Sequence, residues 1–189
     1  MKRILLLTIA LFSIGLAQAQ EHMSFKGVPM DCDLTTFISK LNAIGYTSTI
    51  VQDDSAALEG DFAGKSDCTI LVLGTAQTKQ VWKVAVIFPE KSSWYSLKNE
   101  YRNMIESYTA KYGKPETYEY FLDPYYEGDG YELQAVKYKK CIYSAYFTAS
   151  TGSINVYIDD TCCVMVTYED GINVNLWKSE KENIIANDI

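Results

Sequence analysis

The chain has 189 residues, and its 17 Lys and Arg against 24 Asp and Glu give a formal net charge of −7. An acidic chain repels phosphate backbones and anionic lipid surfaces, which disfavours nucleic acid and membrane surfaces as partners. The length suffices for one domain of ordinary size or for two small halves that share a core.

The first nineteen residues are typical of an export signal. Met1–Arg3 is a basic start, Ile4–Leu16 is mostly apolar, and Ala17–Ala19 has the small-x-small pattern of a cleavage site. We expect cleavage after Ala19 and export to the periplasm or beyond the cell. Loss of two bases then leaves 15 against 24 acids, a net charge of −9. No later segment approaches the roughly 20 apolar residues of a membrane helix, so no membrane insertion is expected.

Residues 20–89 predict a first half made of one helix and four strands. Asp33 can cap a helix whose apolar positions follow at helical spacing, and Gly45 can end it. The apolar positions are Leu34, Phe37, Ile38, Leu41 and Ile44. Strand-like runs follow at Tyr46–Val51, Ala57–Phe62, Cys68–Gly74 and Val81–Phe88. The short turns between them indicate an antiparallel meander.

Residues 90–189 predict a second half with the same order. Ser92 or Ser93 can cap a second helix, which Gly113 and Pro115 end. Its apolar face is Trp94, Leu97, Tyr101, Met104, Ile105, Tyr108 and Tyr112. Strands are expected at Glu116–Leu122, Tyr131–Tyr138, Cys141–Ala149, Ile154–Asp159 and Cys162–Tyr168, and a last helix from near Asp170 towards Ile185.

The fold class expected is therefore α+β, with two tandem halves, each a helix plus an antiparallel meander, and a C-terminal helix. The repeated order suggests an internal duplication. Its clearest register is C-x6-T-A-x-T, which begins at Cys68 and again at Cys141.

Four stretches carry a resemblance to a known group of proteins: FKGVPMDCDLTTFISKLNAIGY, ALEGDFAGKSDCTILVLG, VAVIFPEKSSWYSLKNEYRNM and YTAKYGKPE. From about Phe25 to the C-terminus the chain resembles uncharacterised secreted proteins of gut bacteria. The resemblance implies export and an α+β fold, without a catalytic assignment. Most of that group has Gly-Thr where this chain has Cys32-Asp33. The tandem layout is also similar to that of β-lactamase-inhibitor proteins, as an analogy of architecture.

Motifs for catalysis and for cofactors are missing from the sequence. It contains no GxSxG, GxGxxG or GxxxxGK, and its single histidine, His22, falls in a lead segment expected to be mobile. There is no CxxC pair for zinc. We therefore assign no catalytic residue, no metal and no cofactor. A hydrolase based on paired carboxylates is kept as an alternative.

The segment DPYYEGDGYE, residues 123–132, is the most suggestive surface feature. Its carboxylates Asp123, Glu127, Asp129 and Glu132 could offer oxygens to calcium, but their spacing departs from an EF-hand loop. Tyr125 and Tyr126 flank a polar, glycine-containing loop, and exposed tyrosines favour protein or sugar contacts. We expect the two tyrosines, with Asp123, Glu127 and Asp129, to belong to a binding surface for a protein or glycan. The function predicted is a secreted, non-enzymatic binding module, with an inhibitor-like protein that docks a periplasmic enzyme as an alternative.

Five cysteines follow the signal in a chain bound for a disulfide-permissive compartment. If the halves are related by a pseudo-twofold axis, Cys68 could bridge Cys141 and tie them together. Cys162 and Cys163 are adjacent, so only one of them could pair with Cys32.

Overall fold

The computed structural model describes residues 21–188, so the expected signal peptide, residues 1–19, lies outside the described part. The first half contains β1 (Ser24–Phe25), β2 (Val28–Pro29), α1 (Leu34–Ala43), β3 (Thr47–Val51), β4 (Ser55–Phe62), β5 (Lys65–Gly74) and β6 (Val81–Ile87). The second contains α2 (Trp94–Tyr112), β7 (Glu116–Phe121), α3 (Glu132–Lys137), β8 (Cys141–Ala149), β9 (Gly152–Ile158), β10 (Val164–Asp170) and α4 (Asn173–Asp188). The α+β fold class is confirmed.

The two meanders join into one continuous sheet of eight antiparallel strands. Their order is β3-β4-β5-β6-β10-β9-β8-β7, and β1 and β2 form a separate hairpin. The last strand of each half therefore lies at the centre, where Val84 is opposite Tyr168 and Val86 is opposite Val166. The outer edges are β3 and β7, the first strands of the two halves.

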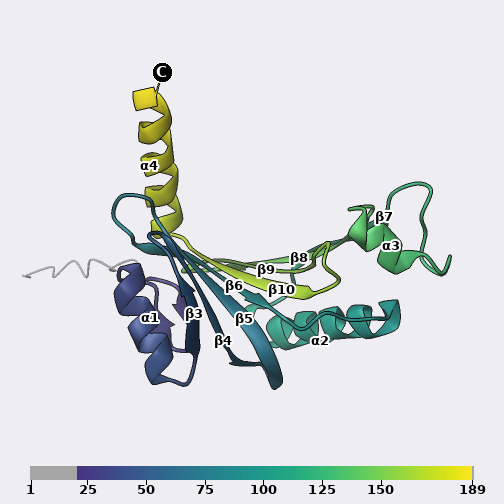
Figure 1. The fold of residues 1–189 in the computed structure, drawn as a ribbon. Helices are drawn as coiled ribbons and strands as arrows, with labels where there is room; N and C mark the ends of the chain where they lie inside the picture. Colours follow the sequence, from purple (N-terminus) through teal and green to yellow (C-terminus); the bar gives the residue numbers. More distant parts are fainter. Residues whose placement is uncertain (1–20, 189) are drawn as a thin grey trace, which may run out of the picture.

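Helices α1 and α2 lie over different parts of the sheet, α1 beside β3 and α2 below β9 and β10 (Figure 1). α1 contacts β3, β4 and β5, whereas α2 contacts β8, β9 and β10. The strands alternate, so every second side chain packs into this helix-covered core. Its fully buried members include Phe37, Leu41, Leu58, Ile70, Val72, Leu97, Tyr101, Phe147 and Ile154. Within residues 21–188, no helix is long and apolar enough to cross a bilayer.

Both main helices begin where their capping residues predict. The Asp33 carboxylate accepts the backbone N–H of Thr36 at 3.0 Å, and the Ser93 hydroxyl accepts that of Ser96 at 3.2 Å. Each contact satisfies one of the N–H groups that a helix start leaves free. At the C-terminal end of α2, Gly113 has a φ of 83°, the left-handed conformation that a glycine stop supplies.

The prediction of a strand at Tyr131–Tyr138 is wrong, because this segment contains the short helix α3. Ala135 and Val136 are buried and Leu133 packs partly against the core, so the apolar residues fit one side of a helical turn rather than alternate faces. Leu, Gln, Ala and Lys also favour helix over strand.

The alignment of the predicted internal repeat, which matched Cys68 with Cys141, is also wrong. Cys68 lies in β5, the third strand of its half, whereas Cys141 lies in β8, the second strand of the other half. The residues between β7 and β8, 122–140, include a long loop and α3, while only residues 52–54 separate β3 from β4. This extra segment shifts the later strands, so the order of elements repeats but the residue register does not.

The Cys68–Cys141 disulfide is contradicted for the same reason. Three strands, β6, β10 and β9, lie between β5 and β8. Four strand spacings of about 4.8 Å far exceed the roughly 7 Å that a disulfide can span. The backbone of Cys32 bonds to Val81 at the start of β6, whereas that of Cys162 bonds to Lys91, beyond the end of β6, so these two cysteines are also far apart.

All five cysteines are free thiols. Burial raises the pKa of Cys141 to about 12, and it also raises the pKa of Cys68, Cys162 and Cys163. Their thiols are therefore protonated at neutral pH and pack as small apolar groups.

Candidate functional site

The face of the sheet opposite α1 and α2, here called the open face, carries a group of partly exposed tyrosines. Strand alternation and register place Tyr118 and Tyr120 of β7, Tyr146 of β8 and Tyr157 of β9 on this face. The first three are 43%, 46% and 47% exposed. Half-exposed rings on a regular sheet are held in place by the strands yet remain open to a partner.

Three of these tyrosines line a shallow cleft, the tyrosine cleft, of about 470 Å³ across β7 and β8. It is lined by Glu116, Tyr118, Tyr120, Ile142, Ser144 and Tyr146. The Tyr118 and Tyr146 rings meet edge to face, with centroids 6.1 Å apart. The Tyr118 hydroxyl donates to the Glu116 carboxylate, and this hydrogen bond raises the pKa of Tyr118. The cleft thus presents aromatic rings, phenolic hydroxyl groups and one carboxylate.

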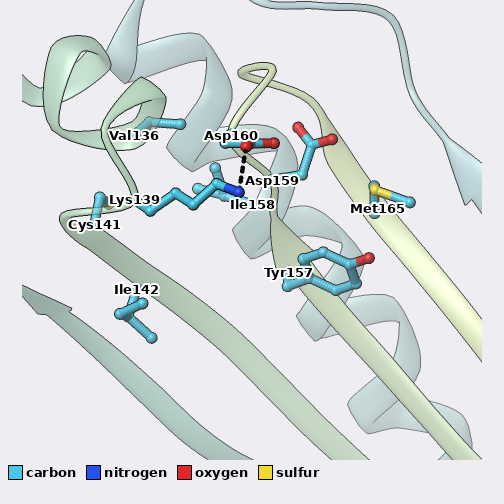
Figure 2. A pocket seen from close by; sticks show the side chains of 9 residues that line it. All are labelled: Val136, Lys139, Cys141, Ile142, Tyr157, Ile158, Asp159, Asp160 and Met165. Carbon is cyan, nitrogen blue, oxygen red and sulfur yellow. Dashed lines mark ion pairs between the residues drawn. The ribbon is translucent and has the colours of Figure 1, made fainter.

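A second hollow, the corner pocket, adjoins the tyrosine cleft through Ile142 and encloses about 400 Å³. Figure 2 shows Ile142, Tyr157 and Met165 along the strands, with Lys139 from the end of α3 facing Asp160 from the β9–β10 turn. The Lys139 Nζ to Asp160 Oδ2 distance is 3.0 Å, and the lysine side chain is 78% exposed. Such an exposed ion pair contributes only about 0–1 kcal/mol, so it can open for a ligand at little cost.

Helix α4 stands beside the sheet and projects away from the side that α1 and α2 cover (Figure 1). Its Trp177 ring stacks on Trp82 of β6, with centroids 4.3 Å apart. Trp82 is the extra residue of a β-bulge against β5, which turns its side chain away from the regular alternation. Glu180 is buried and accepts the N–H groups of Gln77 and Thr78 and the Thr78 hydroxyl, at 2.7, 3.2 and 2.7 Å.

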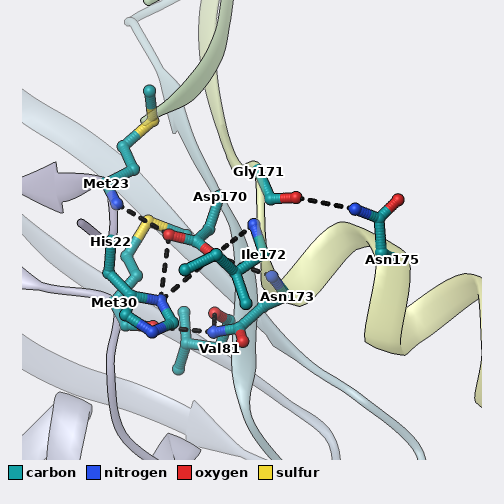
Figure 3. A network of polar contacts seen from close by, with 9 residues as sticks. All are labelled: His22, Met23, Met30, Val81, Asp170, Gly171, Ile172, Asn173 and Asn175. Carbon is teal, nitrogen blue, oxygen red and sulfur yellow. Dashed lines mark hydrogen bonds and ion pairs between the residues drawn. The ribbon is translucent and has the colours of Figure 1, made fainter. Parts of the chain in front are cut away.

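The base of α4 is fixed by the buried carboxylate of Asp170 (Figure 3). It accepts the backbone N–H groups of Met23, Ile172 and Asn173 at 2.6, 3.0 and 2.7 Å, and His22 Nδ1 lies 3.2 Å away. The lead segment around His22, expected to be mobile, is therefore bonded to the start of α4. A short sequence window could not reveal this contact, because its partners are 148 residues apart.

The attachment of α4 should depend on pH through Glu180. Burial alone would raise the pKa of this carboxyl, but the hydrogen bonds from Thr78 and Gln77 outweigh it and hold the pKa below its usual value of 4.5. A lowered folded-state pKa stabilises the attachment above the unfolded pKa and loses that effect as the pH falls through the folded pKa. Acidification from about pH 6 to about pH 3 should loosen the Trp82–Trp177 stack, which near-ultraviolet circular dichroism would detect. Glu180→Gln should lack this acid step, and an identical step in both proteins would contradict the assignment.

The loop proposed from sequence, residues 123–132, lies apart from the open face and uses its carboxylates internally. Glu127 pairs with Lys98 of α2 and accepts the Tyr143 hydroxyl at 3.1 Å. Its pKa is lowered, chiefly by the hydrogen bond from Lys98. Asp129 accepts the N–H groups of Tyr126 and Tyr131 at 3.1 and 2.7 Å. No cluster of metal-ligating residues occurs between residues 21 and 188.

The other residues of this loop are less constrained. Tyr125 is half-buried and packs against the core, whereas Tyr126 is 65% exposed. Asp123 is exposed and precedes a cis peptide bond to Pro124. Of the five residues named from sequence, Tyr126 and Asp123 are therefore the two that remain open to a partner.

Tyr118, Tyr120 and Tyr146 were not among the site residues predicted from the sequence, although the sequence contains a signal for them. In ETYEYF the residues Glu116, Tyr118 and Tyr120 alternate with Thr117, Glu119 and Phe121, the period that separates the two faces of a strand. What the sequence lacked was the packing of α1 and α2, which leaves this side of β7 and β8 uncovered.

Comparisons of the chain with protein-family models, with curated proteins and with solved structures gave no match.

Proposed function

We propose that the protein is an exported binding module that docks a protein partner on its open face. The observation that carries this proposal is the set of half-exposed tyrosines on β7 and β8, with the less exposed Tyr157 on β9 beside them, on a face that α1 and α2 leave bare. Tyrosine offers a large rigid contact area and a hydrogen-bonding tip, and it is enriched where protein interfaces gain most of their binding energy.

The dimensions of the open face favour a protein over a small ligand. Eight strands at about 4.8 Å spacing give a width of about 34 Å, and strands of about seven residues give a length of about 23 Å. This area is close to the roughly 800 Å² that each partner buries in a standard interface. The two adjoining hollows, about 470 and 400 Å³, are shallow features of that surface. A periplasmic enzyme, docked in the manner of an inhibitor, is the narrower form of this proposal.

Replacing the three cleft tyrosines should weaken binding strongly. We expect wild-type protein to capture a partner from periplasmic extract after cross-linking, and the variant Tyr118→Ser, Tyr120→Ser, Tyr146→Ser to capture at least about tenfold less, since each lost ring removes buried apolar contact. Quantitative mass spectrometry of the captured proteins is the measurement.

Tyr95 and Tyr131 supply the matched control, because they are 76% and 61% exposed and lie outside the cleft. Their double serine variant should capture as the wild type does. A separate Tyr126→Ser variant tests the loop predicted from sequence, and a glycan array probed with the same proteins tests a sugar ligand. Equal capture by the cleft variant and the wild type would refute the open face as the docking surface.

A further inference from the structure

Strand β7 is an exposed edge of the sheet. Within residues 21–188 no strand pairs with its outer side, and five of its six residues are exposed. It pairs with β8 over its whole length without a bulge. The opposite edge differs, since β3 has a register irregularity between Ser48 and Ile50 and contacts α1. Of the usual protections of an edge strand, which are bulges, covering elements and charged side chains, β7 has only the charges of its two glutamates.

The backbone groups that β7 turns outward can be assigned from its register. Phe121 is opposite Cys141, and the next residue, Leu122, donates its N–H to Lys140 O at 2.7 Å. Residues of an antiparallel pair alternate between those that bond to the partner strand and those that face away. Tyr118 and Tyr120 therefore bond to β8, while the N–H and C=O groups of Thr117, Glu119 and Phe121 face the free edge.

The charge of β7 indicates what kind of strand would fit there. The strand carries Glu116 and Glu119 and no basic residue. Pairing with the β7 of a second copy would place four carboxylates in one short ribbon, and like charges on adjacent strands are unfavourable. A basic extended segment of another protein instead places ammonium or guanidinium groups beside these carboxylates, and its alternate side chains fall beside Tyr118 and Tyr120 in the tyrosine cleft.

We propose that β7 accepts a basic, extended segment of a partner protein as a ninth strand, with alternate side chains of that segment seated beside the tyrosine cleft. Main-chain hydrogen bonds provide affinity in this binding mode, and side-chain hollows provide specificity. The inference rests on the proposed function, because β7 forms one side of the tyrosine cleft.

The test uses a nine-residue peptide of alternating Lys and Val as probe. A second peptide of the same sequence carries an N-methyl group on every residue, which keeps the charge but removes the N–H groups of both edges. We expect the first to bind at least about tenfold more tightly than the second, because a fully N-methylated backbone has no N–H group to donate to β7 in either orientation. A Glu–Val peptide should bind more weakly than either. Equal affinity for the methylated and unmethylated probes would overturn the inference.

A matched pair of variants tests the same point on the protein. Thr117→Pro removes an outward N–H without removing a bond to β8, which is where an edge strand tolerates proline. Thr117→Val keeps the N–H and the shape. Peptide binding should fall about tenfold in the first and stay unchanged in the second. In wild-type protein, the amides of Thr117, Glu119 and Phe121 should gain protection from hydrogen exchange on binding. If Thr117→Pro does not fold, the methylated probe and the exchange pattern still decide.

The two proposals fail separately. If the cleft variant loses the captured partner but the methylated and unmethylated peptides bind equally well, docking on the open face is supported and strand addition is contradicted. If the peptide adds to β7 but the cleft variant captures the partner as well as the wild type, strand addition is supported and docking through the tyrosines is contradicted.

Discussion

Asp170→Ala should lower the free energy of unfolding by about 3–5 kcal/mol, the largest loss expected for one substitution here. The carboxylate is fully buried and accepts three backbone N–H groups, those of Met23, Ile172 and Asn173. Alanine would leave these donors without an acceptor, at about 1–3 kcal/mol for each that stays buried, and would remove the cap of α4. Urea denaturation at neutral pH, analysed by linear extrapolation, is the measurement.

Two controls separate the loss of this network from the loss of a charge. Asp170→Asn keeps one acceptor oxygen at the start of α4 and should lose less than Asp170→Ala. Asp160→Ala removes a 42% exposed carboxylate paired with Lys139, and its effect should stay below about 1 kcal/mol. A change below about 0.5 kcal/mol for Asp170→Ala would contradict the view that this carboxylate holds the N-terminal segment and α4 together.

The elements that sequence predicted well are those specified by local chemistry. Asp33 and Ser93 mark helix starts because each side chain bonds to an N–H three residues later, within reach of a short window. The strand Cys141–Ala149 has the bounds that its residues predict. α3 was mistaken for a strand because six residues contain too few turns for a helical period to be distinguished from alternation.

The error about the cysteine pairing, and the absence of the cleft tyrosines from the sequence-based prediction, both come from distance along the chain. Cys68 and Cys141 begin similar segments, but the sheet order separates their strands, and only long-range pairing sets that order. The contact between His22 and Asp170 is equally remote in sequence. Tyr118 and Tyr120 could be placed on one face by alternation. That this face is the open one depends on where α1 and α2 pack, which local patterns do not specify.

A buried cluster of charged residues lies on the helix-covered side of the sheet, behind the open face. Glu100 of α2 is 3% exposed, and its two carboxylate oxygens lie 3.2 Å from Lys65 Nζ of β5 and from Lys91 Nζ. This cluster connects a strand of the first half with the helix of the second. A continuous sheet needs such links, because a shift between the halves would bend the surface that the tyrosines share with β6 and β10.

Removing the two lysines should destabilise the protein more than removing the glutamate. Lys65 and Lys91 are 46% and 24% exposed, so after Glu100→Met each ammonium can extend into water. The buried Glu100 carboxylate cannot reach water in this way. The double variant Lys65→Met, Lys91→Met therefore leaves a buried charge without a partner. We expect a loss of about 3–5 kcal/mol for the double variant and about 1–2 kcal/mol or less for Glu100→Met, measured by urea denaturation.

The triple variant, with methionine at Glu100, Lys65 and Lys91, completes this comparison. Since an apolar cluster of similar volume avoids the cost of dehydrating a charge, it should recover most of the stability that the double variant loses. Stability in the order wild type or triple variant, then Glu100→Met, then the double variant identifies the buried carboxylate as the group that requires compensation. If the double variant is instead more stable than Glu100→Met, the buried carboxylate does not depend on the two ammonium groups, and the assignment of a compensating ion-pair cluster is contradicted.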